Sequence, residues 1–303
     1  MWPLHLQIEL TDNCNLYCDY CYRNSKNNIK KANYISFHKI KKSLDNLKSK
    51  NLLEIGITGG EPTLHPNFKD IMHYVLKNFE LVELVTNAKN KEVLIDMLKT
   101  LSSKMESRLN LSISFNKWLR DLPKFKSKKH YLFKTLKEIT KIHSVRVICT
   151  DYLYNNFKSK EIVKLLKNVG VKSIDFSFVL PIGRGKNKIN ELEYLKRYPF
   201  RKKKSFTPTG YNCGLILKHT AVDPSGNLRP CALFPLSFVI GSLYSNLFKK
   251  DFRKLYTLQA PNKEICGDCK NYLYCVGCIY KGLCNTNKYC EYKKYIKGDI
   301  PYY

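Results

Sequence analysis

Cys14-Asn15-Leu16-Tyr17-Cys18-Asp19-Tyr20-Cys21 brings three thiols close together, directly after a short apolar run near the start of the chain. A tetrahedral zinc site, or a cubane iron–sulfur cluster held entirely by protein, needs four ligands. The next cysteine along the chain is Cys149, so this stretch supplies only three. The spacing therefore predicts a metal centre with one coordination position open to another molecule.

The residues around this loop begin a regular alternation of strands and helices. His5 to Leu10 reads as a strand, and Ser36 is the expected N-cap of a helix that runs to about Lys50. The rhythm continues with strands expected at 54–58, 81–86, 109–114, 144–149 and 173–179, and helices at 68–78, 91–101, 131–142 and 160–168. Such alternation predicts an α/β fold with a parallel sheet, either doubly wound or a barrel with fewer than eight units.

In either architecture the active site forms at the C-terminal ends of the strands. This edge is expected to gather residues from several segments, namely 14–21, 59–62, Asn87, Ser114 and Asp151. Asp12 and Asp151 are the candidate proton acceptors at strand ends. Ordinary acid–base and nucleophilic motifs are absent from the sequence.

The chain has 303 residues, 44% of them hydrophobic, which is enough for a substantial core. It contains no apolar run of membrane-spanning length and no signal peptide, so a cytoplasmic protein is expected. The cytosol keeps thiols reduced, and twelve cysteines there indicate metal or redox ligands rather than disulfides. Cys149 lies alone in an apolar run and is expected to be a core residue.

The formal net charge of +28 would suit an acidic partner such as RNA or an acidic peptide. Most lysines, however, are scattered along predicted helices, which is equally typical of a solvated surface. Only residues 197–204 (RYPFRKKK) form a concentrated basic patch. No module that interleaves basic and aromatic residues is visible, so nucleic-acid binding is not favoured.

The alternation stops after Gly185. Residues 186–210 read as a basic connector, and the chain from Cys213 onward is rich in turns and cysteines. Residues 219–222 and 228–233 flank Asp223-Pro224-Ser225-Gly226-Asn227, which predicts a hairpin with Gly226 at positive φ.

The motif Cys14-x3-Cys18-x2-Cys21, with Tyr20 before the third cysteine and Gly59-Gly60-Glu61-Pro62 at a later strand end, resembles the radical S-adenosylmethionine superfamily. The resemblance covers Gln7 to about Gly185 and implies a partial (β/α)6 barrel of the TIM type. It also implies a 4Fe–4S cluster on the three cysteines, with S-adenosylmethionine at the open iron. Reductive cleavage of that cofactor would give methionine and a 5′-deoxyadenosyl radical that abstracts hydrogen from a substrate.

Further site residues follow from the same resemblance. Gly59, Gly60 and Glu61 would bind the methionine amino group, because the glycines allow close backbone approach and the carboxylate pairs with an ammonium. Tyr20 would lie near the adenine, and Ser114 would contact the ribose, although the acidic and glycine residues usual after that serine are Asn116 and Lys117 here. Asn87 and Arg146 are weaker candidates for cofactor contacts.

The eight late cysteines resemble the SPASM extension of these enzymes, which carries auxiliary 4Fe–4S clusters. The resemblance divides the chain into a radical S-adenosylmethionine barrel (1–185), the connector (186–210) and a SPASM domain (211–303). One auxiliary cluster would use Cys213, Cys231 and Cys278; the outer one would use Cys266, Cys269, Cys275 and Cys290. Cys284 stays unassigned. Two residues separate Cys275 from Cys278, one fewer than is usual in the family. A pair of zinc sites is the alternative for the same cysteines.

SPASM enzymes mainly modify peptides and proteins, so the resemblance implies oxidative maturation of a peptide or protein substrate, with electrons from a flavodoxin- or ferredoxin-type donor. Many relatives that crosslink peptides carry a leader-recognition domain before the cysteine motif, which here starts at position 14. Leader binding is then expected from the connector, another surface or a separate protein. The alternatives are chemistry on a small cofactor or tetrapyrrole precursor and, less favoured, RNA modification.

Overall fold

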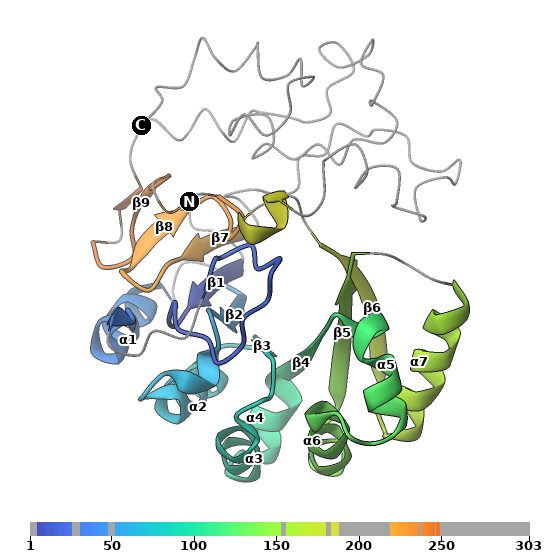
Figure 1. Cartoon of the computed structure of the whole chain (residues 1–303). Helices are drawn as coiled ribbons and strands as arrows, with labels where there is room; N and C mark the ends of the chain where they lie inside the picture. The colour runs from blue at the N-terminus through green and yellow to red at the C-terminus, as the bar shows by residue number, and fades with distance from the viewer. Residues whose placement is uncertain are drawn as a thin grey trace, which may run out of the picture.

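The structure is a computed structural model that describes residues 5–25, 31–47, 52–152, 156–179, 183–187, 219–234, 236, 238–245 and 247–248. Within these ranges all strands belong to one sheet, with the order β10-β9-β8-β7-β1-β2-β3-β4-β5-β6 (Figure 1). The strands are β1 (His5–Glu9), β2 (Glu54–Thr58), β3 (Leu81–Thr86), β4 (Leu109–Asn116), β5 (Val145–Asp151), β6 (Ser173–Phe178), β7 (His219–Val222), β8 (Asn227–Arg229), β9 (Gly241–Ser242) and β10 (Leu247–Phe248).

Helices connect β1 to β6 in sequence and lie along the outer side of the curved sheet (Figure 1). Neighbouring strands from β1 to β6 are parallel, which confirms the α/β partial-barrel prediction. The helices are α1 (Phe37–Leu47), α2 (Phe68–Asn78), α3 (Lys91–Lys99), α4 (Ser103–Arg108), α5 (Trp118–Lys126), α6 (Tyr131–Ile139) and α7 (Asn156–Asn168), with short 3-10 turns η3 (Pro62–Leu64) and η4 (Gly183–Asn187). No helix in these ranges is long and apolar enough to cross a membrane.

The apolar periodicity of the sequence explains how each element faces the core. In α1, Ile40, Leu44 and Leu47 are buried, and Ser36 begins the helix by accepting from the backbone amide of Lys39. In β1, Leu6 and Ile8 are fully buried in the hydrophobic core, whereas Gln7 between them lines the central cavity. Strand alternation thus leaves one face of the sheet for the core and the other for a site.

The C-terminal strands extend the same sheet beyond β1. β7 is parallel to β1, with His219 opposite His5, and β8 returns antiparallel to β7. The predicted hairpin is present: the carboxylate of Asp223 accepts from the amides of Ser225 and Asn227, and Gly226 has a φ of +86°. Its second strand is shorter than expected, because β8 ends at Arg229. Residues 188–218 lie outside the described ranges, so the proposed connector and domain limits remain predictions.

The sequence did not predict α4 and α5. Helix α5 contains Pro123 and begins after Lys117, whose φ is +52°. Proline inside a helix and a non-glycine residue in the left-handed region are both uncommon, so the local pattern favours a loop there. Burial of Trp118, Leu122 and Phe125 in the core compensates for these local preferences.

Candidate active site

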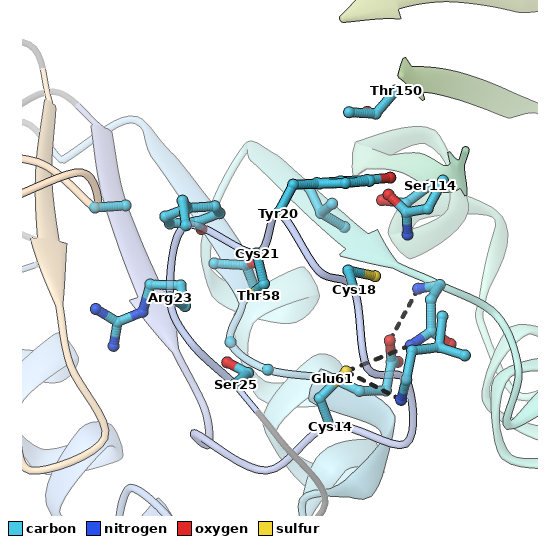
Figure 2. Close-up of a pocket in the computed structure, with 18 of the residues that line it drawn as sticks. Cys14, Cys18, Tyr20, Cys21, Arg23, Ser25, Thr58, Glu61, Ser114 and Thr150 are labelled. Atoms are coloured by element: carbon cyan, nitrogen blue, oxygen red, sulfur yellow. Dashed lines mark hydrogen bonds between the residues drawn. The ribbon is translucent and has the colours of Figure 1, made fainter. Parts of the chain in front are cut away.

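A cavity of about 700 Å³ opens at the C-terminal ends of the barrel strands. Its walls combine the cysteine loop, the turn after β2 and inward side chains of the strands (Figure 2). The lining residues predicted from the sequence are Cys14, Cys18, Cys21, Tyr20, Gly59, Gly60, Glu61, Asn87, Ser114 and Cys231. Segments far apart in the sequence therefore meet at one place, at the strand edge where the fold class places the site.

The cysteine loop is held by backbone hydrogen bonds and by one arginine that follows the last barrel strand in the sequence. The amide of Cys21 donates to the carbonyl of Cys18 at 3.2 Å, which closes a tight turn. Arg184 in η4 donates to the carbonyl oxygens of Cys18 (2.7 Å) and Ser25 (2.8 Å), and its guanidinium lies 4.3 Å from the ring centroid of Tyr17. Arg184 therefore fixes the loop that presents the thiols.

Burial makes the thiolate forms of these cysteines unfavourable without a compensating positive charge. It raises the pKa of Cys14 to about 12 and that of Cys18 to about 11, where the neighbouring Cys21 adds to the effect. Iron bound to the thiols would supply the missing charge, since metal ligation requires the thiolate.

No three histidine, cysteine or acidic side chains in the described ranges converge as ligands of a single metal ion would. Each thiolate of a cubane binds a different iron atom, so its ligands surround the cluster instead of meeting at one point. Three cysteines around one cavity fit a cluster with three protein ligands, and Figure 2 shows Cys14, Cys18 and Cys21 at separate places along the loop that lines it.

Gly59 and Gly60 admit the backbone of the cysteine loop. The amide of Gly60 donates to the carbonyl of Thr11 at 2.6 Å, and the amide of Glu61 donates to the carbonyl of Asn13 at 2.8 Å. A Cβ atom on Gly60 would lie 2.1 Å from the oxygen of Asn13, and one on Gly59 would lie 2.7 Å from that of Thr11. The two glycines thus let the turn after β2 pack with its backbone against the residues that precede Cys14.

Glu61 organises the turn from a fully buried position. Its Oε1 accepts from the hydroxyls of Thr63 (2.6 Å) and Thr86 (2.5 Å), and its Oε2 accepts from the amide of Asn87 (2.8 Å). Burial raises the pKa of this carboxyl, while these hydrogen bonds favour the charged form. Oε2 retains acceptor capacity for a ligand ammonium beside Cys14 (Figure 2).

The remaining predicted cofactor contacts surround the same space. The Tyr20 hydroxyl accepts from the amide of Lys117 at 3.1 Å, so its ring is held between the cysteine loop and the ends of β4 and β5, near Ser114 and Thr150 (Figure 2). The side-chain amide of Asn87 donates to Asn15 at 3.0 Å and lies 3.8 Å from the sulfur of Cys14. Asn87 therefore connects the end of β3 to the first cysteine.

Three predicted site residues are not brought to this cavity. Arg146 stands at the start of β5, at the opposite end of the sheet, where it donates to Ser112 (2.9 Å) and pairs with Glu83. Asp12 accepts from the backbone amide and side chain of Asn33, both at 2.8 Å. Asp151 is buried and accepts from the amide of Leu119 at 2.9 Å, at the start of α5. Each of these side chains serves a local structural contact.

Of the proposed auxiliary ligands, only Cys231 is described, and it lines the cavity. Cys213, Cys266, Cys269, Cys275, Cys278, Cys284 and Cys290 lie outside the described residues, so their assignment remains a prediction. Cys149 is fully buried in β5, as expected of a core residue.

Sequence reasoning missed two arginines of the site, Arg23 and Arg184. Both line the cavity, and Arg184 depends on Gly183, whose φ is +55° and whose Cβ would lie 2.4 Å from the oxygen of Cys21. The run Gly183-Arg184-Gly185, a few residues after the last barrel strand, was the available signal. Its role depends on contacts with residues more than a hundred positions away, which spacing alone does not reveal.

Comparison with known proteins agrees with this geometry. Residues 8–116 match the Radical SAM superfamily. The antilisterial bacteriocin subtilosin biosynthesis protein AlbA of Bacillus subtilis is 31% identical over 95% of this chain and 69% of its own length. A GTP 3′,8-cyclase of Clostridium perfringens is 29% identical over 60% of this chain and 57% of its own length.

The fold has a counterpart among solved structures. The crystal structure of Streptococcus suis SuiB bound to S-adenosylmethionine superposes with a TM-score of 0.68 at 15% identity, covering 96% of this chain and 76% of SuiB. SuiB bound to its precursor peptide SuiA gives a TM-score of 0.67 at 16% identity, over 96% of this chain and 74% of SuiB. Motif, cavity and similarity together establish that the chain belongs to the radical SAM superfamily of enzymes.

Proposed function

We propose that this enzyme uses S-adenosylmethionine to modify a peptide or protein substrate oxidatively, in the manner of ribosomal peptide maturation. The observation that carries the proposal is the joint lining of one cavity by Cys14, Cys18, Cys21 and Cys231, together with similarity to AlbA over 95% of the chain. When bound, a 4Fe–4S cluster and S-adenosylmethionine supply the electron and the 5′-deoxyadenosyl radical.

The chain itself binds, orients and shields. Cys14, Cys18 and Cys21 would hold the cluster, Oε2 of Glu61 would accept from the methionine ammonium, and Tyr20 and Ser114 would position the adenosine. Neutral side chains such as Gln7, Thr150 and Ser177 line the cavity as well, together with Arg23 and Arg184. Hydrogen abstraction from carbon by a radical needs no acid–base pair, so the proposal assigns no proton-transfer role to the side chains of this lining.

Removal of the substrate electron is assigned to the auxiliary sites. Cys231 would be a ligand of an auxiliary 4Fe–4S cluster that faces the cavity, with the other late cysteines completing one or two such clusters. A flavodoxin- or ferredoxin-type donor would reduce the N-terminal cluster. With three cubanes the reconstituted protein would contain about twelve irons.

A second candidate is chemistry on a small molecule, favoured by the similarity to GTP 3′,8-cyclase. A nucleoside triphosphate requires cationic side chains to pair with its phosphates. Arg23 and Arg184 are the arginines of the described lining, and there is no lysine in it. Arg23 is paired with Glu9, and Arg184 donates through Nε and Nη2 to loop carbonyls, so both arginines of the described lining already hold protein groups. This makes a triphosphate the less supported substrate.

The test is incubation of anaerobically reconstituted enzyme with S-adenosylmethionine, a reductant and short peptides encoded beside its gene. We expect one peptide to lose pairs of hydrogen atoms, detected by mass spectrometry, while a Cys18→Ala variant leaves it unchanged. Deoxyadenosine formation with modification of a small molecule but of no peptide would contradict the proposal.

A further inference from the structure

A fully buried carboxylate at the end of β1, Glu9, lies between two arginines from the two cysteine-bearing loops. Its Oε2 is 2.5 Å from Nη2 of Arg23 and 2.7 Å from Nη2 of Arg229. The side chains of Glu9 and Arg229 are 0% exposed, and that of Arg23 is 8% exposed. One carboxylate oxygen therefore joins residues that are 206 positions apart in the sequence.

Each arginine is two residues from a cysteine of the site. Arg23 follows Cys21, and Arg229 precedes Cys231. Nη1 of Arg229 also donates to the carbonyl oxygens of Ala232 (3.2 Å) and Phe234 (2.6 Å), so its guanidinium folds the chain around Cys231. Figure 2 shows Arg23 leaving the cysteine loop on the side away from Cys14 and Cys18.

Stability of the fold alone is a weak explanation for burying the charged side chains of Glu9, Arg23 and Arg229. Burying charged groups carries a desolvation penalty of several kcal/mol per ion, and apolar residues of similar volume often stabilise as well or better. These three charged side chains also leave hydrogen-bonding groups unused, because Oε1 of Glu9 and Nε of Arg229 have no hydrogen-bond partner among the described residues. What the arrangement provides is a defined distance between two loops, with the guanidinium groups of Arg23 and Arg229 next to both; the buried carboxylate of Asp223 also lies near enough to act on Glu9.

We propose that Glu9 is a positioning residue that ties the Cys21 loop to the Cys231 loop through Arg23 and Arg229. The tie fixes the N-terminal cluster relative to an auxiliary cluster on Cys231, and the positive charge of each arginine favours the reduced state of the clusters beside it. This inference rests on the proposed function, since it takes Cys231 as a cluster ligand. Its distinctive consequence is that a change at Arg229 reaches the N-terminal cluster through Glu9.

The test uses the full-length enzyme, reconstituted anaerobically and reduced in the presence of S-adenosylmethionine. Electron paramagnetic resonance then gives the g-values of each cluster, and redox titration gives its midpoint potential. We expect Arg229→Gln to shift the g-values of the N-terminal cluster and to lower the potentials of both clusters. Glu80→Gln, which removes a surface partner of Arg108, is the matched control and is expected to change neither.

Glu9→Gln is expected to shift the g-values of both clusters, and Arg229→Gln added to it should change the g-values of the N-terminal cluster no further. If Glu9→Gln does not fold, Arg229→Gln decides alone, because it leaves the Glu9–Arg23 pair in place. An N-terminal signal identical to wild type in Arg229→Gln overturns the tie. Wild-type protein with about four irons would instead remove the auxiliary cluster, and so the proposed function's second site.

Discussion

At the scale of single residues, the two carboxylate oxygens of Glu61 have different roles. Its Oε1 holds Thr63 and Thr86, and its Oε2 holds the amide of Asn87 while facing the ligand space beside Cys14. The Gly-Gly-Glu motif was readable from the sequence because its residues are contiguous. The reason for the glycines was not, since it depends on the Thr11 and Asn13 carbonyls that meet them.

Replacing Glu61 with Gln removes the charge but almost no volume. We expect S-adenosylmethionine to bind roughly ten- to a hundredfold more weakly, because a hydrogen bond to a charged group contributes about 1.5–3 kcal/mol. Equilibrium binding to the reconstituted enzyme measures this. Thr86→Val, which keeps the carboxylate and removes one donor to it, is the matched control with a smaller expected loss. Equal affinity of Glu61→Gln and wild type would exclude the assigned role.

Arg146 illustrates a residue-level prediction that its position could have corrected. It is the second residue of β5, and parallel strands enter the sheet at the end opposite the active site. There it contacts Ser112 and Glu83. The sequence predicted this strand to begin at residue 144, one residue before β5 does, and either start places Arg146 at the end of the sheet opposite the active site. The sequence alone could therefore have excluded Arg146 from the site.

At the scale of elements, Asp151 supplies the start of α5 with a cap that its own N-cap residue lacks. Lys117 makes no side-chain capping bond, whereas Asp151 accepts from the amides of Leu119 and Tyr152 at 2.9 and 2.7 Å. A helix that contains Pro123 and borrows its cap from a neighbouring strand has no local signal, which is why the sequence did not predict α5.

Asp151→Ala is expected to lower the free energy of unfolding by about 0.5–2 kcal/mol, the usual cost of losing an N-cap. Chemical denaturation of the purified protein measures this. Asp151→Asn keeps an acceptor oxygen and should retain most of both stability and deoxyadenosine formation. Loss of activity in Asp151→Asn at wild-type stability would restore Asp151 as a proton acceptor.

His65, just after η3, makes the fold sensitive to acid. Its Nε2 donates to the carbonyl of Ile35 at 2.8 Å, and its Nδ1 accepts from the amide of Asn67 at 3.0 Å. Burial lowers the pKa of this imidazole, so the unfolded chain binds the proton more tightly. The resulting stability is present above the ordinary histidine pKa and is lost as the pH falls below it.

We therefore expect urea unfolding to show a loss of stability between about pH 7.5 and 5.5, on either side of the ordinary histidine pKa. His65→Gln should show a smaller loss over this interval, although it is less stable at the upper pH. His38→Gln, at an exposed position, is the matched control. An unchanged pH dependence in His65→Gln would contradict the assignment.

At the scale of the whole molecule, the sheet joins the two cysteine-rich parts of the chain. β7 pairs with β1 in parallel, so Cys231 after β8 reaches the cavity that Cys14 to Cys21 line. The six-strand rhythm and the hairpin were predictable because both are local patterns. The pairing of β7 with β1 was not predictable, because the sequence of a hairpin does not specify which distant strand edge it joins.

The central claim is that Cys14, Cys18 and Cys21 hold the cluster that cleaves S-adenosylmethionine, and deoxyadenosine formation under reducing conditions tests it most directly. We expect the wild type and a Cys149→Ala control, altered at a buried thiol of β5, to form deoxyadenosine. The triple alanine variant of Cys14, Cys18 and Cys21 should form none. Undiminished deoxyadenosine from that triple variant would contradict the account.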